Sequence, residues 1–229
     1  MLASGAPGPA GNLRGPTLLL DLDGTLVDPA RGTIAAVRAA LVALGQPARP
    51  AGDLHWVIGP PLRQSFATLL GGPERVEDAV ALYRAEYARA GIFDARPYDG
   101  IHAELDRLAT AYRLLLCTSK ALPFARQVVA WFGFAPYLGG VYGAELDGRF
   151  DDKGDLIAHI LAQEALDPSR TVMIGDRSTD AEAAVENGVR CIGALWGYGD
   201  ANELTQGGAT RICAAPADLT SCVAAVLGA

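Results

Sequence analysis

Two aspartates stand two residues apart where an aliphatic run ends, in PTLLLDLDGTLVDPA (residues 16–30). The run 17–22 predicts a strand buried on both faces, as in parallel α/β sheets. Because strand side chains alternate, Asp21 and Asp23 fall on the same side of its carboxyl end, where their like charges repel. A bound cation, or a proton on one of the two, relieves that repulsion. The structural alternative is a solvated strand end with an Asp-Gly turn.

Two further segments carry groups that suit a phosphate. Thr118 and Ser119 end a second aliphatic run and offer a hydroxyl and backbone N–H groups near a helix start, although an ordinary N-cap explains them equally well. Lys153 opens a predicted helix in DDKGDLI. Helix N-termini do not favour cations, so this lysine is either aimed at an anion or an indifferent surface residue.

A fourth segment, GDRSTD, supplies two more carboxylates. Asp176 lies at a predicted strand tip and can join Asp21 around a hard cation. Asp180, in the first turn of the next helix, can hold a metal-bound water or a nearby ammonium, or simply cap the helix. All these groups fall on one edge of one predicted sheet. Together they predict a Mg²⁺ and phosphate site.

The elements that position these residues alternate between strand and helix, which predicts a doubly wound parallel sheet of the Rossmann-like kind. Residues 28–97 break the alternation with three helical patterns, and they are expected to form a small helical cap inserted over the site. The α/β core is then 16–27 and 98–229, and 1–15, rich in Gly, Ala and Pro, is expected to be a flexible tail. Further strands are expected within the apolar runs 112–120, 139–145, 170–180, 188–199 and 209–215, and helices at 101–111, 123–132, 153–164, 179–187 and 216–227.

Composition bounds the class of protein. The chain has 229 residues, half of them hydrophobic, and a formal net charge of −7. The acidic balance disfavours nucleic-acid binding, and no apolar run is long enough for a membrane span. The four cysteines are too widely spaced for a zinc site and are expected to be reduced, in a cytoplasmic protein.

These motifs resemble those of the haloacid dehalogenase superfamily: DxDGT at 21–25, Thr118, Lys153 and GDxxxD at 175–180. Stretches such as IGPPLRQSF and MIGDRSTDAEAA are similar to the phosphoglycolate-phosphatase-like and 5'-nucleotidase-like branch, whose members carry a helical cap. The resemblance covers nearly the whole chain from residue 16. One departure is Gly154, which follows the motif lysine where many relatives have proline.

The resemblance implies a role for each motif residue. Asp21 would attack phosphorus to form an aspartyl-phosphate, and Asp23, initially protonated, would act as acid and then base. Mg²⁺ would be held by Asp21, Asp176 and the backbone carbonyl of Asp23, with Asp180 in support. Thr118, Ser119 and Lys153 would stabilise the phosphoryl oxygens.

The cap should recognise the leaving group. Arg63 is a candidate for a substrate hydroxyl or carboxylate, or else a solvated arginine. His55 and Trp56 are candidates for lining the cap interface, with an ordinary core position as the alternative for Trp56. His102 and His159 are expected to be structural or exposed.

The resulting hypothesis is a Mg²⁺-dependent phosphatase acting on a small phosphate ester: phosphoglycolate, a nucleoside 5'-monophosphate or a ribosyl phosphate of specialised metabolism. A phosphomutase shares every core motif and stays open, as does a non-catalytic phosphate-binding module. A dehalogenase would not need the second acid at position 23. Oligomeric state is not predicted.

Overall fold

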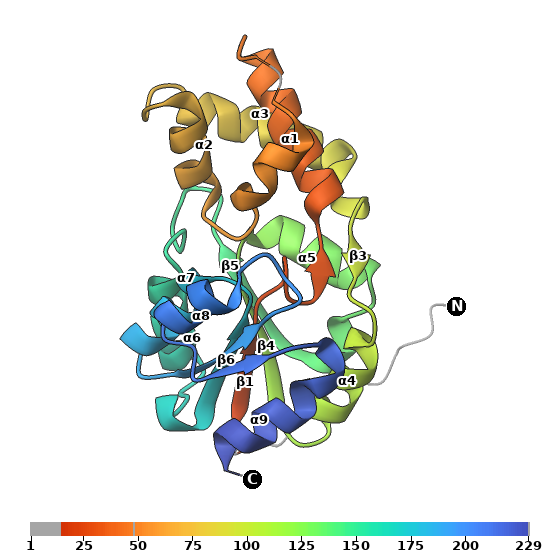
Figure 1. Cartoon of the computed structure of the whole chain (residues 1–229), viewed down its shortest axis with the longest axis vertical. Helices are drawn as coiled ribbons and strands as arrows, with labels where there is room; N and C mark the ends of the chain where they lie inside the picture. The colour runs from red at the N-terminus through yellow and green to blue at the C-terminus, as the bar shows by residue number, and fades with distance from the viewer. Residues whose placement is uncertain (1–14, 48, 229) are drawn as a thin grey trace, which may run out of the picture.

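The computed structural model describes residues 15–47 and 49–228, so nearly all of the predicted tail lies outside it. Its core is a six-stranded parallel sheet in the order β5-β4-β1-β6-β7-β8 (Figure 1). The predicted doubly wound α/β fold is confirmed. The strands are β1 (Thr17–Leu20), β4 (Arg113–Ala121), β5 (Leu138–Ala144), β6 (Thr171–Gly175), β7 (Arg190–Ala194) and β8 (Arg211–Cys213).

Strand β1 lies in the middle of the sheet and belongs to both hydrophobic layers. Leu18 and Leu20 are part of the buried cluster that includes helices α4 (Ile101–Ala109), α5 (Leu122–Trp131) and α9 (Leu219–Leu227), whereas Leu19 is part of the cluster that includes α6 (Lys153–Gln163) and α7 (Ser178–Glu186). This alternation explains why every residue of the strand is apolar or fully covered. The core helices are α4 (Ile101–Ala109), α5 (Leu122–Trp131), α6 (Lys153–Gln163), α7 (Ser178–Glu186), α8 (Ala201–Gln206) and α9 (Leu219–Leu227).

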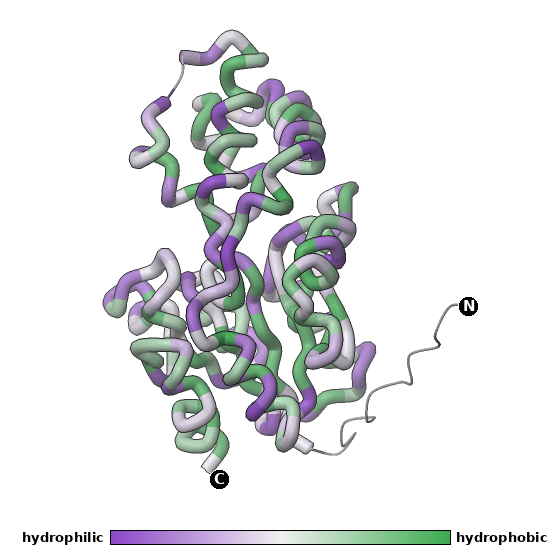
Figure 2. Tube along the Cα trace, turned by 90° about the vertical axis from the view of Figure 1, so that its right-hand side faces the viewer, coloured by the Kyte–Doolittle hydropathy of each residue, from purple (hydrophilic) through white to green (hydrophobic). Residues whose placement is uncertain are grey.

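A helical layer is inserted between β1 and β4 and covers the carboxyl edge of the sheet (Figures 1 and 2). It contains α1 (Ala30–Ala43), α2 (Leu62–Leu70) and α3 (Val76–Arg89), with short 3₁₀ segments at Ala51–Val57 and Gly91–Phe93. The chain enters and leaves it through an antiparallel ribbon of β2 (Val27–Asp28) and β3 (Arg96–Pro97). We propose this ribbon as the boundary between a cap, 28–97, and the core.

Several strand boundaries differ from the sequence expectation, among them those of β1 and β8. β1 ends at Leu20 instead of residue 22. Asp21 N still donates to Ile174 O of β6 (2.9 Å), and the chain then turns away from the sheet. β8 has only three residues, the expected length of an edge strand that ends a sheet. No helix in the described ranges is long and apolar enough to span a membrane.

Candidate active site

The first motif folds into a tight turn at the end of β1. Asp21 is buried, and Gly24 adopts the left-handed conformation (φ +86°) as its N–H bonds to Val27 O (2.8 Å). A Cβ on Gly24 would lie 2.1 Å from Asp176 Oδ2, so no larger residue fits there without displacing that carboxylate. The glycine therefore brings the first and fourth motifs together.

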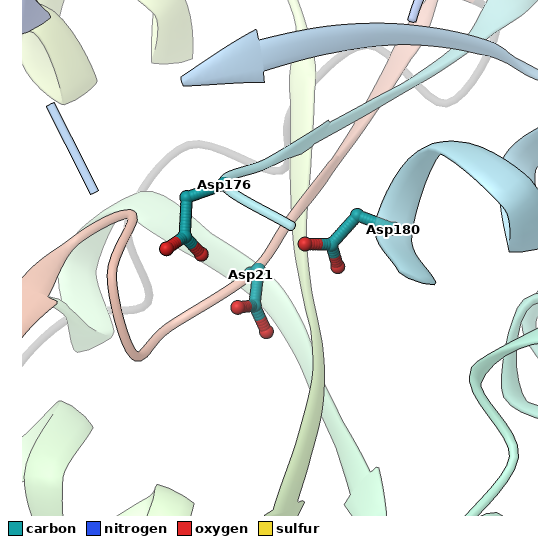
Figure 3. A group of neighbouring side chains, drawn as sticks. All are labelled: Asp21, Asp176 and Asp180. Atoms are coloured by element: carbon teal, nitrogen blue, oxygen red, sulfur yellow. The ribbon is translucent and has the colours of Figure 1, made fainter. Parts of the chain in front are cut away.

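Three carboxylates from separate elements meet beside this turn. Asp21 follows β1, Asp176 follows β6 and Asp180 lies in the first turn of α7, and their oxygens approach within 4.8 Å of one another (Figure 3). Asp180 combines the two functions that the sequence left as alternatives: Oδ2 accepts from Arg177 N (3.1 Å) as a helix cap, and Oδ1 accepts from Lys153 Nζ.

Lys153 is the cation of this cluster. It is the first residue of α6, and its Nζ is 2.9 Å from Asp21 Oδ1 as well as hydrogen-bonded to Asp180. The side chain is buried, so the surface alternative is wrong. Burial alone would lower the pKa of Lys153, but the carboxylates of Asp180 and Asp21 outweigh it and raise that pKa.

One ammonium does not neutralise three buried carboxylates. Burial raises the pKa of Asp21 from 3.8 to about 6; the Lys153 ammonium opposes this rise and the Asp180 carboxylate adds to it. Burial, followed by the charges of Asp180 and Asp21, also raises the pKa of Asp176 well above its usual range. The cluster thus favours a further positive charge.

The donors fit a hard divalent cation such as Mg²⁺. Asp176 Oδ2 accepts from Tyr198 N (2.8 Å), whereas its Oδ1 is buried with no hydrogen-bond partner among the residues described. A Cβ on Gly197 would meet Asp176 Cβ at 2.3 Å, so the chain is kept small on this side too. Carboxylate oxygens in such a group are the usual ligands of Mg²⁺.

The second motif lies on the pocket side of Asp21. β4 continues past the expected strand end to Ala121, and Thr118 Oγ1 accepts from Lys120 N (3.2 Å). Thr118 and Ser119 line the same pocket as Asp21 and Asp23. The structure therefore brings together every core residue proposed from the sequence.

Lys120 is a site residue to which sequence reasoning gave no role. Its side chain is only 7% exposed, its Nζ donates to Asp23 Oδ2, and Nζ lies 4.6 Å from the ring centroid of Tyr87 in the cap. Burial alone would lower its pKa, but Asp23, and to a lesser degree Tyr87, raise it. Its place at a strand tip beside Thr118 was a signal available in the sequence; its cap partner was not.

The cap closes the pocket with apolar and aromatic walls. Besides the motif residues and Lys120, the pocket is lined by these residues of the cap and the core: Thr33, Val57, Ile58, Gly59, Pro60, Leu62, Arg63, Val80, Tyr83, Arg84, Tyr87, Ala121, Phe124, Ala144 and Asp151. The cavity is thus shaped by both layers, and its lining combines aliphatic, aromatic and cationic side chains.

The two cap arginines differ in their partners. Arg63 pairs with Glu77 (Nε–Oε1 2.6 Å) and with Asp151 of the core (Nη1–Oδ2 2.9 Å), so it ties cap to core. Arg84 donates to Leu146 O (2.9 Å), forms no ion pair within the described part of the chain, and keeps a buried, unpartnered Nε. Burial, followed by the like charge of Arg63, lowers the pKa of Arg84.

The aromatic and histidine candidates have ordinary packing roles. His55 stacks on Tyr198 of the core (centroids 6.3 Å apart) and therefore does lie at the cap interface, whereas Trp56 is exposed. His102 stacks on Phe134 and His159 on Phe150, so of the two expected alternatives, structural or exposed, the packing favours the structural one.

Residues 18–194 match the family model described as haloacid dehalogenase-like hydrolase. The chain belongs to this family. The haloacid dehalogenase-like assignment accounts for the order of the four motifs and for the inserted helical layer. Because the family match spans most of the chain, both layers of the fold are included in it.

Named relatives of this haloacid dehalogenase-like protein include phosphatases and one kinase. It is 40% identical to a 5'-nucleotidase of Pseudomonas aeruginosa over 204 residues, 88% of this chain and 92% of that protein. It is 41% identical over 187 residues to tyrosine-protein kinase PtkA of Mycobacterium tuberculosis, covering 81% of this chain and 64% of that protein. The crystal structure of a predicted phosphatase from Clostridium acetobutylicum is 31% identical, with a TM-score of 0.87 over 91% of this chain and 98% of that chain. The protein is accordingly a phosphatase that acts on phosphate esters.

Proposed function

We propose that the protein is a Mg²⁺-dependent phosphomonoester hydrolase that forms an aspartyl-phosphate on Asp21. The observation that supports this most is the position of Asp21, which lies between the acidic cluster and the pocket lined by Thr118 and Ser119. The proposed nucleophile is thus next to both a cation site and hydrogen-bond donors for a phosphate.

In the first displacement, an oxygen of Asp21 attacks phosphorus and the bond to the leaving oxygen breaks. Asp23 gives its proton to that oxygen, so the leaving group departs as an alcohol. In the second displacement, Asp23, now a carboxylate, takes a proton from water as the water attacks the aspartyl-phosphate. Phosphate leaves and Asp21 is restored. Thr118, the Ser119 amide and Lys153 stabilise the phosphoryl oxygens in both steps.

Asp21, Asp176 and the backbone carbonyl of Asp23 are the proposed metal ligands. When bound, Mg²⁺ would neutralise charge on the nucleophile and the phosphoryl group. Asp180 then serves to hold Lys153 rather than the metal, because both of its oxygens already accept hydrogen bonds from the protein.

The substrate is proposed to be small, because the cap encloses the leaving-group end of the pocket. Arg84, a partly buried guanidinium with an unpartnered Nε, supports a leaving group that carries a second anionic group, as phosphoglycolate does. Nucleoside 5'-monophosphates and ribosyl phosphates remain the other candidates. Four buried free thiols support a reducing, cytoplasmic location.

Phosphate release tests the proposal, measured with and without Mg²⁺ across phosphoglycolate, nucleoside monophosphates, pentose phosphates and hexose phosphates. One preferred ester that requires Mg²⁺ supports hydrolysis and identifies the leaving group. Negligible release from all of them would favour a mutase, which keeps water from its aspartyl-phosphate, or a binding module. The likeness to the tyrosine-protein kinase PtkA adds a further candidate reaction, the transfer of a phosphoryl group to a tyrosine hydroxyl. Incubation with ATP and an added protein, followed by a test for phosphotyrosine, would reveal it.

A further inference from the structure

Asp23 has two oxygens in different surroundings. Oδ2 accepts a hydrogen bond from Lys120 Nζ, whereas Oδ1 is buried and has no hydrogen-bond partner among the described residues. Asp23 and Lys120 both line the pocket that contains Asp21. With Oδ2 occupied, Oδ1 is the oxygen left for proton exchange with a ligand.

Lys120 is itself held by the cap. Its Nζ lies 4.6 Å from the ring centroid of Tyr87 on α3, a distance that gives a favourable cation–π contact. Tyr87 is buried, stacked on Tyr83 (5.4 Å) and packed edge-on against Phe124 of the core helix α5 (5.6 Å). The ring therefore has little freedom to move while the cap covers the core.

The groups proposed to bind the phosphoryl oxygens do not include Lys120. Lys153 approaches Asp21 directly, at 2.9 Å, and Thr118 and Ser119 line the pocket beside Asp21. Lys120, in contrast, forms its ion pair with Asp23. Its contacts connect the acid–base residue with the cap rather than with the nucleophile.

We propose that Lys120 is a positioning residue: it fixes Asp23 so that Oδ1 faces the leaving oxygen, and Tyr87 completes this arrangement from the cap. The inference rests on the proposed function, in which Asp23 transfers the proton. Its consequence is that the acid–base residue is correctly oriented only while the cap covers the site, so that proton transfer is coupled to closure.

The consequence is measurable because protonation matters most for a poor leaving group. A positioned acid contributes about 10²- to 10⁴-fold to rate, and little of this is needed when the departing oxygen is weakly basic. Phenyl phosphate and p-nitrophenyl phosphate have similar shapes, but phenolate is the stronger base. We expect Lys120→Met to lower kcat/KM for phenyl phosphate about 10-fold more than for p-nitrophenyl phosphate.

The experiment measures kcat/KM of the full-length chain with Mg²⁺ on both esters, with folding checked by circular dichroism. kcat/KM is used because it reports the displacement in which the leaving group departs. Asp23→Asn shows how far the two esters diverge in kcat/KM when the acid is lost entirely. Lys120→Arg keeps the charge and should recover part of the kcat/KM that Lys120→Met loses on phenyl phosphate. An equal loss on both esters, or a rise in KM alone, overturns the proposal.

A matched pair at position 87 gives an independent test if Lys120→Met does not fold. Tyr87→Phe keeps the ring and should keep the wild-type ratio between the two esters, whereas Tyr87→Leu removes the ring and should shift the ratio as Lys120→Met does. Equal ratios in both variants contradict the role of the ring. Failure of the proposed function is distinguishable, because the wild type would then hydrolyse neither ester.

Discussion

Replacing Asp21 by Asn should stabilise the metal-free protein while it abolishes turnover. The amide keeps the shape of the carboxylate and can still accept from Lys153, but it removes one of three buried negative charges. Because the nucleophile is lost, phosphate release should stop. Activity and stability are therefore expected to change in opposite directions.

The size of the gain follows from the pKa of Asp21. A rise from 3.8 to about 6 means that the folded protein binds this proton more tightly than the unfolded chain does. The stability that the proton contributes is fully present below about pH 3.8 and is lost as the pH rises through 6. At pH 7.5 the loss is about 3 kcal/mol, and at pH 5 it is about half of that. Asp21→Asn should recover these amounts, which at pH 7.5 corresponds to a rise in Tm of roughly 6–12 °C.

Thermal unfolding followed by circular dichroism in chelator checks this, at pH 5 and at pH 7.5. Asp106→Asn on α4, an exposed carboxylate, is the matched control and should change Tm little at either pH. With Mg²⁺ at 100 Kd the difference at pH 7.5 should nearly vanish, because the wild type then gains about 2.7 kcal/mol from the bound metal. A variant less stable than wild type in chelator, or a difference independent of pH, would refute the electrostatic reasoning.

Three further predictions concern the metal and the cap. Chelation should abolish phosphate release, and added Mg²⁺ should restore it and raise the Tm of the wild type but not of Asp176→Asn; release that persists in chelator would contradict the metal site. Arg84→Met should raise KM for phosphoglycolate about tenfold, equivalent to about 1.4 kcal/mol, and hardly change it for a nucleoside monophosphate; equal changes would argue against an anion subsite. Arg63→Met should speed hydrogen exchange in the loop 145–152, because it removes the ion pair to Asp151, whereas Arg75→Met, whose ion pair lies within the cap, should not.

The core and its catalytic edge were predictable because each depends on local patterns. Aliphatic runs identify parallel strands buried on both faces, and polar residues that follow them must gather at one edge. Asp21, Thr118 and Asp176 were found in this way. The capping function of Asp180 was also visible, since it needs only the three residues before it.

The cap contacts were not predictable, because they depend on how two layers meet. Arg63 was expected to contact substrate or solvent, yet its guanidinium pairs with Glu77 and Asp151, the latter far away in sequence. The contacts of Lys120 were missed for the same reason, because its partners lie in the turn after β1 and on α3. Side-chain pairing between distant segments leaves no periodic signal in the sequence.

The central position of β1 has a consequence for the newly made chain. Among the described strands this one comes first along the chain, yet its partners are β4 at 113–116 and β6 at 171–174, beyond the whole inserted helical layer. The four residues of β1, three of them leucines, must therefore stay unpaired until most of the polypeptide exists. Pairing between segments so far apart in the sequence is slow. The helical layer, which is complete earlier and has its own apolar contacts between α1 and α3, can form first and bring the two halves of the core together. The insertion that covers the site would then also be the element that organises biogenesis of the sheet beneath it.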